Sequence, residues 1–278
     1  MSADVVEEVV QAGEGGRLFG ILTLPAEPKP DRPVFVFLSA GLLHRVGPSR
    51  MNVLVARSLA ARGYTVFRVD LSGKGDTPPS RLSSYKDSVQ DDFETINAAL
   101  SQRLGNVSLV LAGLCSGADN AVRLAVMTPD VKAMLLLDPI CYPGSSFKVR
   151  RFTEKYLSPR RYLARLRRLL VPAKKIAGAG RAQAENDDPL QLRELPTAAE
   201  LKDAVRLVHE RGGGTLALMT QYASLYYNQE GQFAESTWPA AFESRSREHR
   251  WRDVSHTYRV SAHLERLVDE INDWADTL

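Results

Sequence analysis

The segment of the sequence with the clearest chemical meaning is Gly113-Leu114-Cys115-Ser116-Gly117, which follows an apolar run. A very tight turn from a strand into a helix leaves room only for small residues two positions before and two positions after its apex. With Cys115 at the apex those positions hold Gly113 and Gly117, whereas with Ser116 at the apex Leu114 would clash. The spacing therefore favours Cys115 over Ser116 as a nucleophile. The alternative interpretation is a structural cysteine at a glycine-rich junction.

A histidine near the C-terminus supplies the second reactive group. His256 lies between the last predicted strand and the last predicted helix. An imidazole can take or hold the proton of a thiol and later protonate a leaving group. A helix N-terminus and an adjacent imidazole both favour the thiolate, and the helix after Cys115 is expected to begin at Ser116. A tetrahedral oxyanion on this nucleophile would be bound by backbone N–H groups, of which the Ser116 N–H is the first.

Alternating patterns indicate the elements that position these residues. Short, continuously apolar runs are typical of strands buried on both faces, and here they are 34–38, 64–69, 107–111 and 131–137. Stretches with helical spacing separate them at 49–62, 84–104 and 116–128. Strands that alternate with helices predict right-handed βαβ units and a parallel sheet.

The two ends of the chain extend this sheet. Runs 5–10 and 17–24 flank a glycine-rich turn and predict an antiparallel edge hairpin, while 215–220 and 247–254 predict the last strands. The final helix carries an apolar stripe of Val260, Leu264, Leu267, Ile271 and Trp274. We expect a core of residues 1–140 and 212–278, with 141–211 inserted as a helical cap over the carboxyl ends of the strands. The alternative is a helical surface excursion with no part in the site.

These features resemble the α/β-hydrolase superfamily, in a variant with cysteine as the nucleophile. The segment at Cys115 resembles its G-x-S-x-G elbow with cysteine in place of serine. Residues 67–77 resemble its D-x-x-G-x-G-x-S/T segment, and His256 stands where the catalytic histidine of these enzymes lies. Cysteine elbows of this kind are similar to those of dienelactone hydrolases and polyhydroxyalkanoate synthases.

The resemblance implies an α/β-hydrolase fold, with a mostly parallel eight-stranded sheet flanked by helices and a cap after strand 6. It places the second oxyanion amide in the loop after the third strand, at Ala40 or Gly41. Leu42, His44, Cys141 and Tyr222 are candidates for substrate contact in or beside the same loops. For His44, a solvent-exposed or structural role is an equal alternative.

The acidic partner of His256 departs from the superfamily pattern. The superfamily usually takes this acid from the loop after the seventh strand, where Ser224 occupies the expected position. Asp138, at the end of the sixth strand, is our preferred acid, and its alternative role is that of a turn aspartate before Pro139. Asp253 and Glu230 are further candidates.

Composition sets the outer limits. The chain has 278 residues, a net charge of +3, 44% hydrophobic residues and two cysteines. These values indicate a folded globular protein with no disulfide framework and no nucleic-acid partner. The sequence shows no signal peptide, no membrane-spanning run, no metal-ligand spacing and no nucleotide motif, so we expect a cytoplasmic protein without a cofactor.

A basic stretch from 148 to 181 contains a single acid, Glu154, and its residues Arg161, Arg165 and Arg168 share one helical face. This face predicts an anionic partner at the site entrance, either an acyl carrier protein, CoA or an anionic lipid surface. The alternative is a solvated face of a cap helix.

The predicted activity is acyl transfer through a covalent Cys115 intermediate. Hydrolysis of an ester, lactone or thioester is the first hypothesis. The alternatives are a biosynthetic acyltransferase or cyclase, which passes an acyl group from a CoA or carrier-protein thioester to an alcohol or amine, and a homologue that binds a ligand without turning it over.

Overall fold

A single eight-stranded sheet forms the centre of the protein. The computed structural model describes residues 5–29, 31–142, 147 and 193–278. The strands follow the order β1-β2-β4-β3-β5-β6-β7-β8 across the sheet. β1 pairs antiparallel with β2, β2 pairs antiparallel with β4, and every other neighbouring pair is parallel. The bounds are Val6–Ala12 (β1), Leu18–Leu24 (β2), Val34–Leu38 (β3), Val66–Val69 (β4), Leu109–Leu114 (β5), Val131–Leu137 (β6), Thr215–Met219 (β7) and Arg247–Arg250 (β8).

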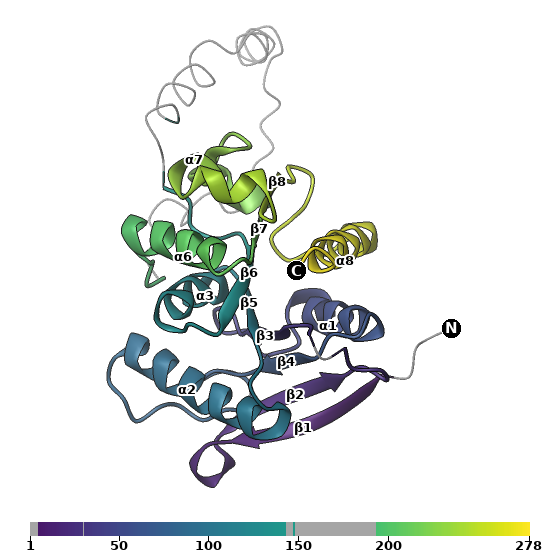
Figure 1. The fold of residues 1–278 in the computed structure, drawn as a ribbon. Coiled ribbons are helices and arrows are strands. Elements are labelled where there is room, and N and C mark those ends of the chain that lie inside the picture. The colour runs from purple at the N-terminus through teal and green to yellow at the C-terminus, as the bar shows by residue number, and fades with distance from the viewer. Residues whose placement is uncertain (1–4, 30, 143–146, 148–192) are drawn as a thin grey trace, which may run out of the picture.

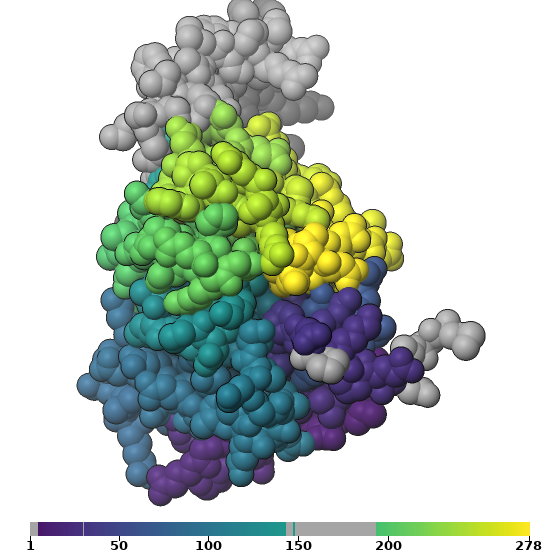
Figure 2. Space-filling view, in the orientation of Figure 1, coloured from purple at the N-terminus to yellow at the C-terminus, as the bar shows by residue number. Residues whose placement is uncertain are grey.

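Helices cover both faces of this sheet. The helices α1 (Met51–Ala61) and α8 (Ser261–Ala275) lie on one side, and α2 (Tyr85–Leu104), α3 (Ser116–Met127) and α6 (Ala198–Glu210) lie on the other (Figure 1). In Figure 2 the green and lime-green residues contain α6 and the short helix α7 (Gln232–Ser236). They lie next to the yellow residues of α8 and above the teal residues, which contain α3. Short 3-10 turns occupy Glu14–Gly16 (η1), Pro48–Arg50 (η2), Gln221–Leu225 (η3) and Pro239–Glu243 (η4).

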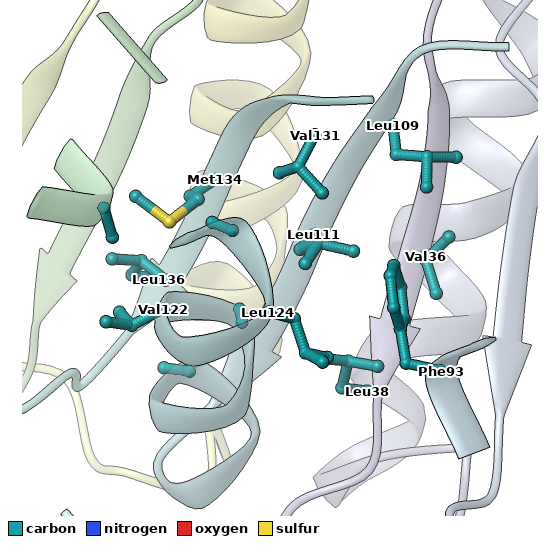
Figure 3. Packing of buried hydrophobic residues seen from close by; sticks show 14 of the residues in the cluster. Val36, Leu38, Phe93, Leu109, Leu111, Val122, Leu124, Val131, Met134 and Leu136 are labelled. Atoms are coloured by element: carbon teal, nitrogen blue, oxygen red, sulfur yellow. The ribbon is translucent and has the colours of Figure 1, made fainter. Parts of the chain in front are cut away.

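The apolar runs bury both faces of the strands, as parallel strands between two helical layers require. In β3, Val36 and Leu38 pack toward α2, α3 and α6, whereas Phe35 and Phe37 pack toward α1 and α8. Figure 3 shows side chains of the first cluster from β3, β5 and β6 meeting those of α2 and α3. Each of these two hydrophobic clusters packs one face of the sheet against one layer of helices. This packing fixes the positions of the carboxyl ends of the strands.

Local signals set the helix ends. The Ser84 hydroxyl accepts a hydrogen bond from the Asp87 N–H at the start of α2. At the start of α6, Thr197 and Glu200 form a reciprocal capping box. Such caps satisfy N–H groups that the first helical turn leaves without partners.

The structure confirms the predicted eight-stranded, mostly parallel sheet and the edge hairpin. Two details differ from the sequence analysis. Val260 is half exposed and precedes α8, so the buried stripe of that helix comprises Leu267, Ile271 and Trp274, with Leu264 partly buried. Helix α6 packs on α3 and β6 and buries Leu201, Ala204, Val205 and Val208, so it belongs to the layer that covers the sheet and not to an inserted cap.

Of the other residues predicted as a cap, 143–146 and 148–192, which include Arg161, Arg165 and Arg168, lie outside the described residues. The predicted anionic partner therefore stays a prediction. Among the described helices, none is both long enough and apolar enough to cross a membrane.

Candidate active site

Cys115 occupies the sharp turn between β5 and α3. Its backbone has φ 56° and ψ −118°, outside the regions that non-glycine residues ordinarily adopt. Such a conformation costs on the order of 1–3 kcal/mol and persists only where the surrounding structure imposes it. The side chain is partly exposed, and α3 begins at the next residue, Ser116.

The turn is crowded on both sides. A Cβ atom on Gly113 would lie 2.2 Å from the carbonyl carbon of Gly117, and a Cβ atom on Gly117 would lie 2.7 Å from the carbonyl oxygen of Leu38. Side chains are therefore excluded two positions before and two positions after Cys115, as the sequence analysis expected. Ser116 is the first residue of a regular helix and does not occupy the apex.

His256 and Asp138 lie beside this turn. His256 is in the loop between β8 and α8, and its Nδ1 is 2.6 Å from Oδ2 of Asp138. Burial disfavours the imidazolium, but hydrogen bonding to Asp138 and Cys115 and the negative charges of both groups outweigh burial and raise the pKa of His256 to about 9. The structure thus brings together Cys115, Asp138 and His256, although 118 residues separate the last two in sequence.

Asp138 is fully buried at the end of β6, with a positive φ of 48°. Its N–H donates to the carbonyl oxygen of Leu218 in β7 at 2.8 Å. Its carboxylate accepts hydrogen bonds from the N–H of Thr220 at 2.6 Å and from the Thr220 hydroxyl at 2.7 Å. The Thr220 N–H binds Oδ1 of Asp138, while the Thr220 hydroxyl and Nδ1 of His256 share Oδ2.

The other acid candidates lie elsewhere. Ser224 is exposed. Asp253 is 3.8 Å from Nε2 of His263, and Glu230 is 3.9 Å from Nδ1 of His249. In the described residues, Asp138 is the acid that contacts His256.

The predicted oxyanion loop approaches the start of α3. The Gly41 N–H donates a 2.7 Å hydrogen bond to Oγ of Ser116. One of the two amides expected to bind the oxyanion is therefore already occupied by a side-chain hydroxyl. The Ser116 side chain must turn away before Gly41 can donate to a substrate.

The segment 67–77 holds this loop in place. The buried Asp70 carboxylate accepts hydrogen bonds from the backbone and side chain of Arg45 and from the N–H of Asp76. The Lys74 ammonium donates to the carbonyl oxygen of Ser39 at 3.3 Å. A Cβ atom on Gly75 would lie 2.1 Å from Asp70, so glycine is required there. In this structure the segment positions the loop and does not meet the reacting groups.

Comparison with known proteins agrees with the observed fold and identifies a family to which the chain belongs. The sequence profile of the family described as serine aminopeptidase, S33, matches residues 38–232. The chain belongs to the S33 family. A search of curated proteins finds no significant match.

Solved structures share the fold at low identity. The esterase domain of a Rhodothermus marinus protein is 17% identical, with 98% of each chain covered and a TM-score of 0.55. Est1E from Butyrivibrio proteoclasticus is 14% identical, with 96% of each chain covered and a TM-score of 0.56. A serine hydrolase without a lid from Xanthomonas campestris is 17% identical, with 99% of this chain and 95% of that chain covered and a TM-score of 0.52.

Membership of the S33 family makes this chain an α/β-hydrolase enzyme. The family is described as serine aminopeptidase, the Xanthomonas campestris protein as a serine hydrolase and the Rhodothermus marinus domain as an esterase. In this chain the residue at the apex of the elbow is a cysteine, Cys115. The likeness to cysteine enzymes of the superfamily accordingly rests on that one residue.

The four candidates for substrate contact separate into three groups. Tyr222 lies against the site, because its ring stacks on the His256 ring with centroids 4.2 Å apart. Leu42 and His44 are exposed on the oxyanion loop, and His44 Nδ1 accepts a hydrogen bond from the Val46 N–H. Cys141 does not line the cleft, since its side chain is fully buried in the core. Burial raises the pKa of the Cys141 thiol to about 12.

Two features of the site were missed in the sequence analysis. Thr220 anchors Asp138, and its position at the end of β7 was the available signal. Arg193 pairs with Asp119, which lies one turn of α3 after Cys115, and no pattern in the sequence marks it. Among the described residues, no group of three or more His, Cys, Asp and Glu side chains is arranged to hold a metal ion.

Proposed function

We propose that this hydrolase forms an acyl intermediate on Cys115, with His256 as the proton carrier and Asp138 as the group that orients it. The proposal is carried by one observation: the strained turn presents Cys115 beside the hydrogen-bonded His256–Asp138 pair. The substrate class is an ester, lactone or thioester.

The reaction would proceed in two stages. The Cys115 sulfur attacks the substrate carbonyl, and the oxyanion is stabilised by the Ser116 N–H and by Gly41 or Ala40 once the Ser116 hydroxyl has moved. The carbonyl bond to the leaving group breaks, and His256 gives that group a proton. Water then attacks the thioester as His256 takes a proton from it, and the acid is released with the thiol restored.

The charge state of His256 fits a sulfur nucleophile. Hydrogen bonding to Asp138 and Cys115 and the negative charges of both groups raise the pKa of this imidazole to about 9. Cys115 is itself one of the causes of this rise, so the pKa describes a thiolate–imidazolium pair and is no independent evidence against Ser116. Geometry favours Cys115 over Ser116, because the Ser116 hydroxyl oxygen accepts a hydrogen bond from Gly41 and Ser116 lies in the helix and not at the apex.

Alkylation tests the nucleophile, with Cys141 as an internal control. Iodoacetamide at pH 7 should modify Cys115 far faster than Cys141, which is fully buried with a raised thiol pKa. Hydrolysis of an aryl ester should vanish in Cys115→Ala and persist in Ser116→Ala. An inert Cys115, or ligand binding without turnover in the unmodified enzyme, would favour a protein that only binds its ligand.

The thioester intermediate also allows transfer, since thioesters react with amines and thiols as well as with water. Intact-protein mass after mixing with an acyl thioester distinguishes the two activities. A hydrolase loses its acyl adduct in water alone, whereas a transferase retains it until an alcohol or amine is added. Hydrolysis is the outcome we expect.

A further inference from the structure

A buried arginine lies beside the proposed nucleophile. The Arg193 side chain is 5% exposed and the Asp119 side chain is 1% exposed. Nε of Arg193 donates to Oδ2 of Asp119 at 2.8 Å, and Nη2 lies 2.7 Å from the same oxygen. Asp119 is held in turn by its position on α3, where its N–H donates to the carbonyl oxygen of Cys115. One edge of the guanidinium is therefore fixed by the same helix that carries the nucleophile.

The other edge of the Arg193 guanidinium carries N–H groups that lack an acceptor among the described residues. Neither Nη1 nor Nη2 donates a well-aligned hydrogen bond to any residue that the structure describes. The hydroxyls of Tyr222 and Tyr226 lie close to the guanidinium and interact with it, but without good hydrogen-bond geometry. A buried guanidinium with unused N–H groups is costly, so this edge requires an acceptor.

Tyr222 connects Arg193 to the residues of the proposed active site. Tyr222 interacts with both Arg193 and Cys115, and its ring stacks on His256. Burial opposes the charge of Arg193, but the negative charges of Asp119 and Cys115 and the hydrogen bond to Asp119 outweigh burial and raise the pKa of Arg193. Arg193 is thus a permanent cation within electrostatic reach of the sulfur.

We propose that Arg193 binds a carboxylate on the acyl portion of the substrate, so that the enzyme prefers monoesters or thioesters of dicarboxylic acids. A guanidinium presents parallel N–H groups that match the two oxygens of a carboxylate. Asp119 acts as a positioning residue, because it holds the guanidinium plane with Nη1 and Nη2 turned to the ligand. The proposal rests on the proposed function, since it specifies the acyl group that Cys115 accepts.

Matched substrates test the preference. The aryl monoester of glutaric acid and the aryl methyl diester of the same acid differ only at the far carboxyl group, which is ionised in the first and is a neutral methyl ester in the second. The unmodified enzyme should favour the charged ester in kcat/KM by roughly 10- to 100-fold. Arg193→Gln should abolish that preference, so that the ratio of kcat/KM between the two esters falls to about 1 whatever the absolute activity of the variant. Arg193→Lys keeps the charge but loses the planar pair of N–H donors, and it should retain part of the preference. Arg206→Gln, a change to a partly exposed arginine of α6, should retain all of it.

A binding measurement separates failure of this proposal from failure of the proposed chemistry. Calorimetry in Cys115→Ala should show that monomethyl glutarate binds at least about tenfold more tightly than dimethyl glutarate, and that Arg193→Gln removes the difference. Equal binding of the two ligands, or equal loss of both esters' turnover in Arg193→Gln, overturns the carboxylate site. Selective binding without any acyl adduct on Cys115 supports the site and overturns the chemistry.

Discussion

Thr220 donates two hydrogen bonds to Asp138, one from its backbone N–H at 2.6 Å and one from its hydroxyl at 2.7 Å. The donor ends β7 and the acceptor ends β6, so the pair ties two neighbouring strands at their carboxyl ends. This tie explains how the proposed acid of the site can follow the sixth strand. The strand that usually supplies the carboxylate in this superfamily here supplies the residue that holds it.

Replacing the hydroxyl tests this tie. Thr220→Val keeps the backbone bond and the shape of the side chain but leaves one oxygen of the buried Asp138 carboxylate with fewer donors. We expect a fall in kcat of roughly 10- to 100-fold, since a hydrogen bond to a charged group contributes about 1.5–3 kcal/mol. Thr220→Ser, which restores the hydroxyl, should recover most of the activity. If the two variants behave alike, the hydroxyl does not orient the acid.

Replacing the acid itself tests its identity. Asp138→Asn should lower kcat by several hundredfold or more, because the amide cannot hold the imidazolium or its tautomer. Ser224→Ala, at the position where the superfamily usually has its acid, should leave kcat unchanged. Steady-state kinetics on an aryl ester measures both variants. A large loss in the second variant with little loss in the first would place the acid after β7.

The sequence allowed much of the fold to be predicted, because the strongest signals are local. The runs in β3 and β6 are apolar at every position that a doubly covered strand buries, and Ser84 marks the start of α2. The apex at Cys115 could be predicted for the same reason, because Gly113 meets the backbone of Gly117, only four residues further along the chain. The predicted strand there ended at Leu111, but β5 continues to Leu114, directly before the turn.

What could not be predicted depends on distant partners. Nothing near Arg193 in the sequence shows that its guanidinium meets Asp119, 74 residues away. The burial of Cys141 depends on packing against α7, where the Ser236 hydroxyl and the Gln232 amide lie beside its sulfur. The occupation of the Gly41 amide by Ser116 depends on how the loop after β3 approaches α3, 75 residues further along the chain.

The raised pKa of His256 predicts a pH dependence of stability. Its value of about 9 lies above the value of 6.5 expected in the unfolded chain. The protonated histidine therefore stabilises the fold fully below about pH 6.5, and this contribution is lost as the pH rises to about 9. The advantage of the unmodified protein over His256→Gln in free energy of unfolding should shrink across this window by up to about 3 kcal/mol. Urea unfolding at pH 6, 7.5 and 9 measures it.

The control for this measurement is a residue whose charge does not change in this pH range. Arg206→Gln, in α6, removes a guanidinium that stays protonated from pH 6 to 9, so its effect on the free energy of unfolding should not open such a window. A difference between the unmodified protein and His256→Gln that does not vary with pH would mean that Asp138 and Cys115 do not hold the proton on this imidazole.

The hydrogen bond from Gly41 to Ser116 predicts a gain of activity on removal of a side chain. In Ser116→Ala the Gly41 N–H is free to bind the oxyanion at once, and no side chain has to turn away. Because a hydrogen bond of this kind contributes about 1 kcal/mol, kcat/KM should rise by up to about tenfold. Ser116→Thr keeps the hydroxyl and should stay near the unmodified enzyme. A loss of tenfold or more in Ser116→Ala would instead show that the hydroxyl takes part in the reaction, either as a third donor to the oxyanion or, if activity disappears, as the nucleophile in place of Cys115.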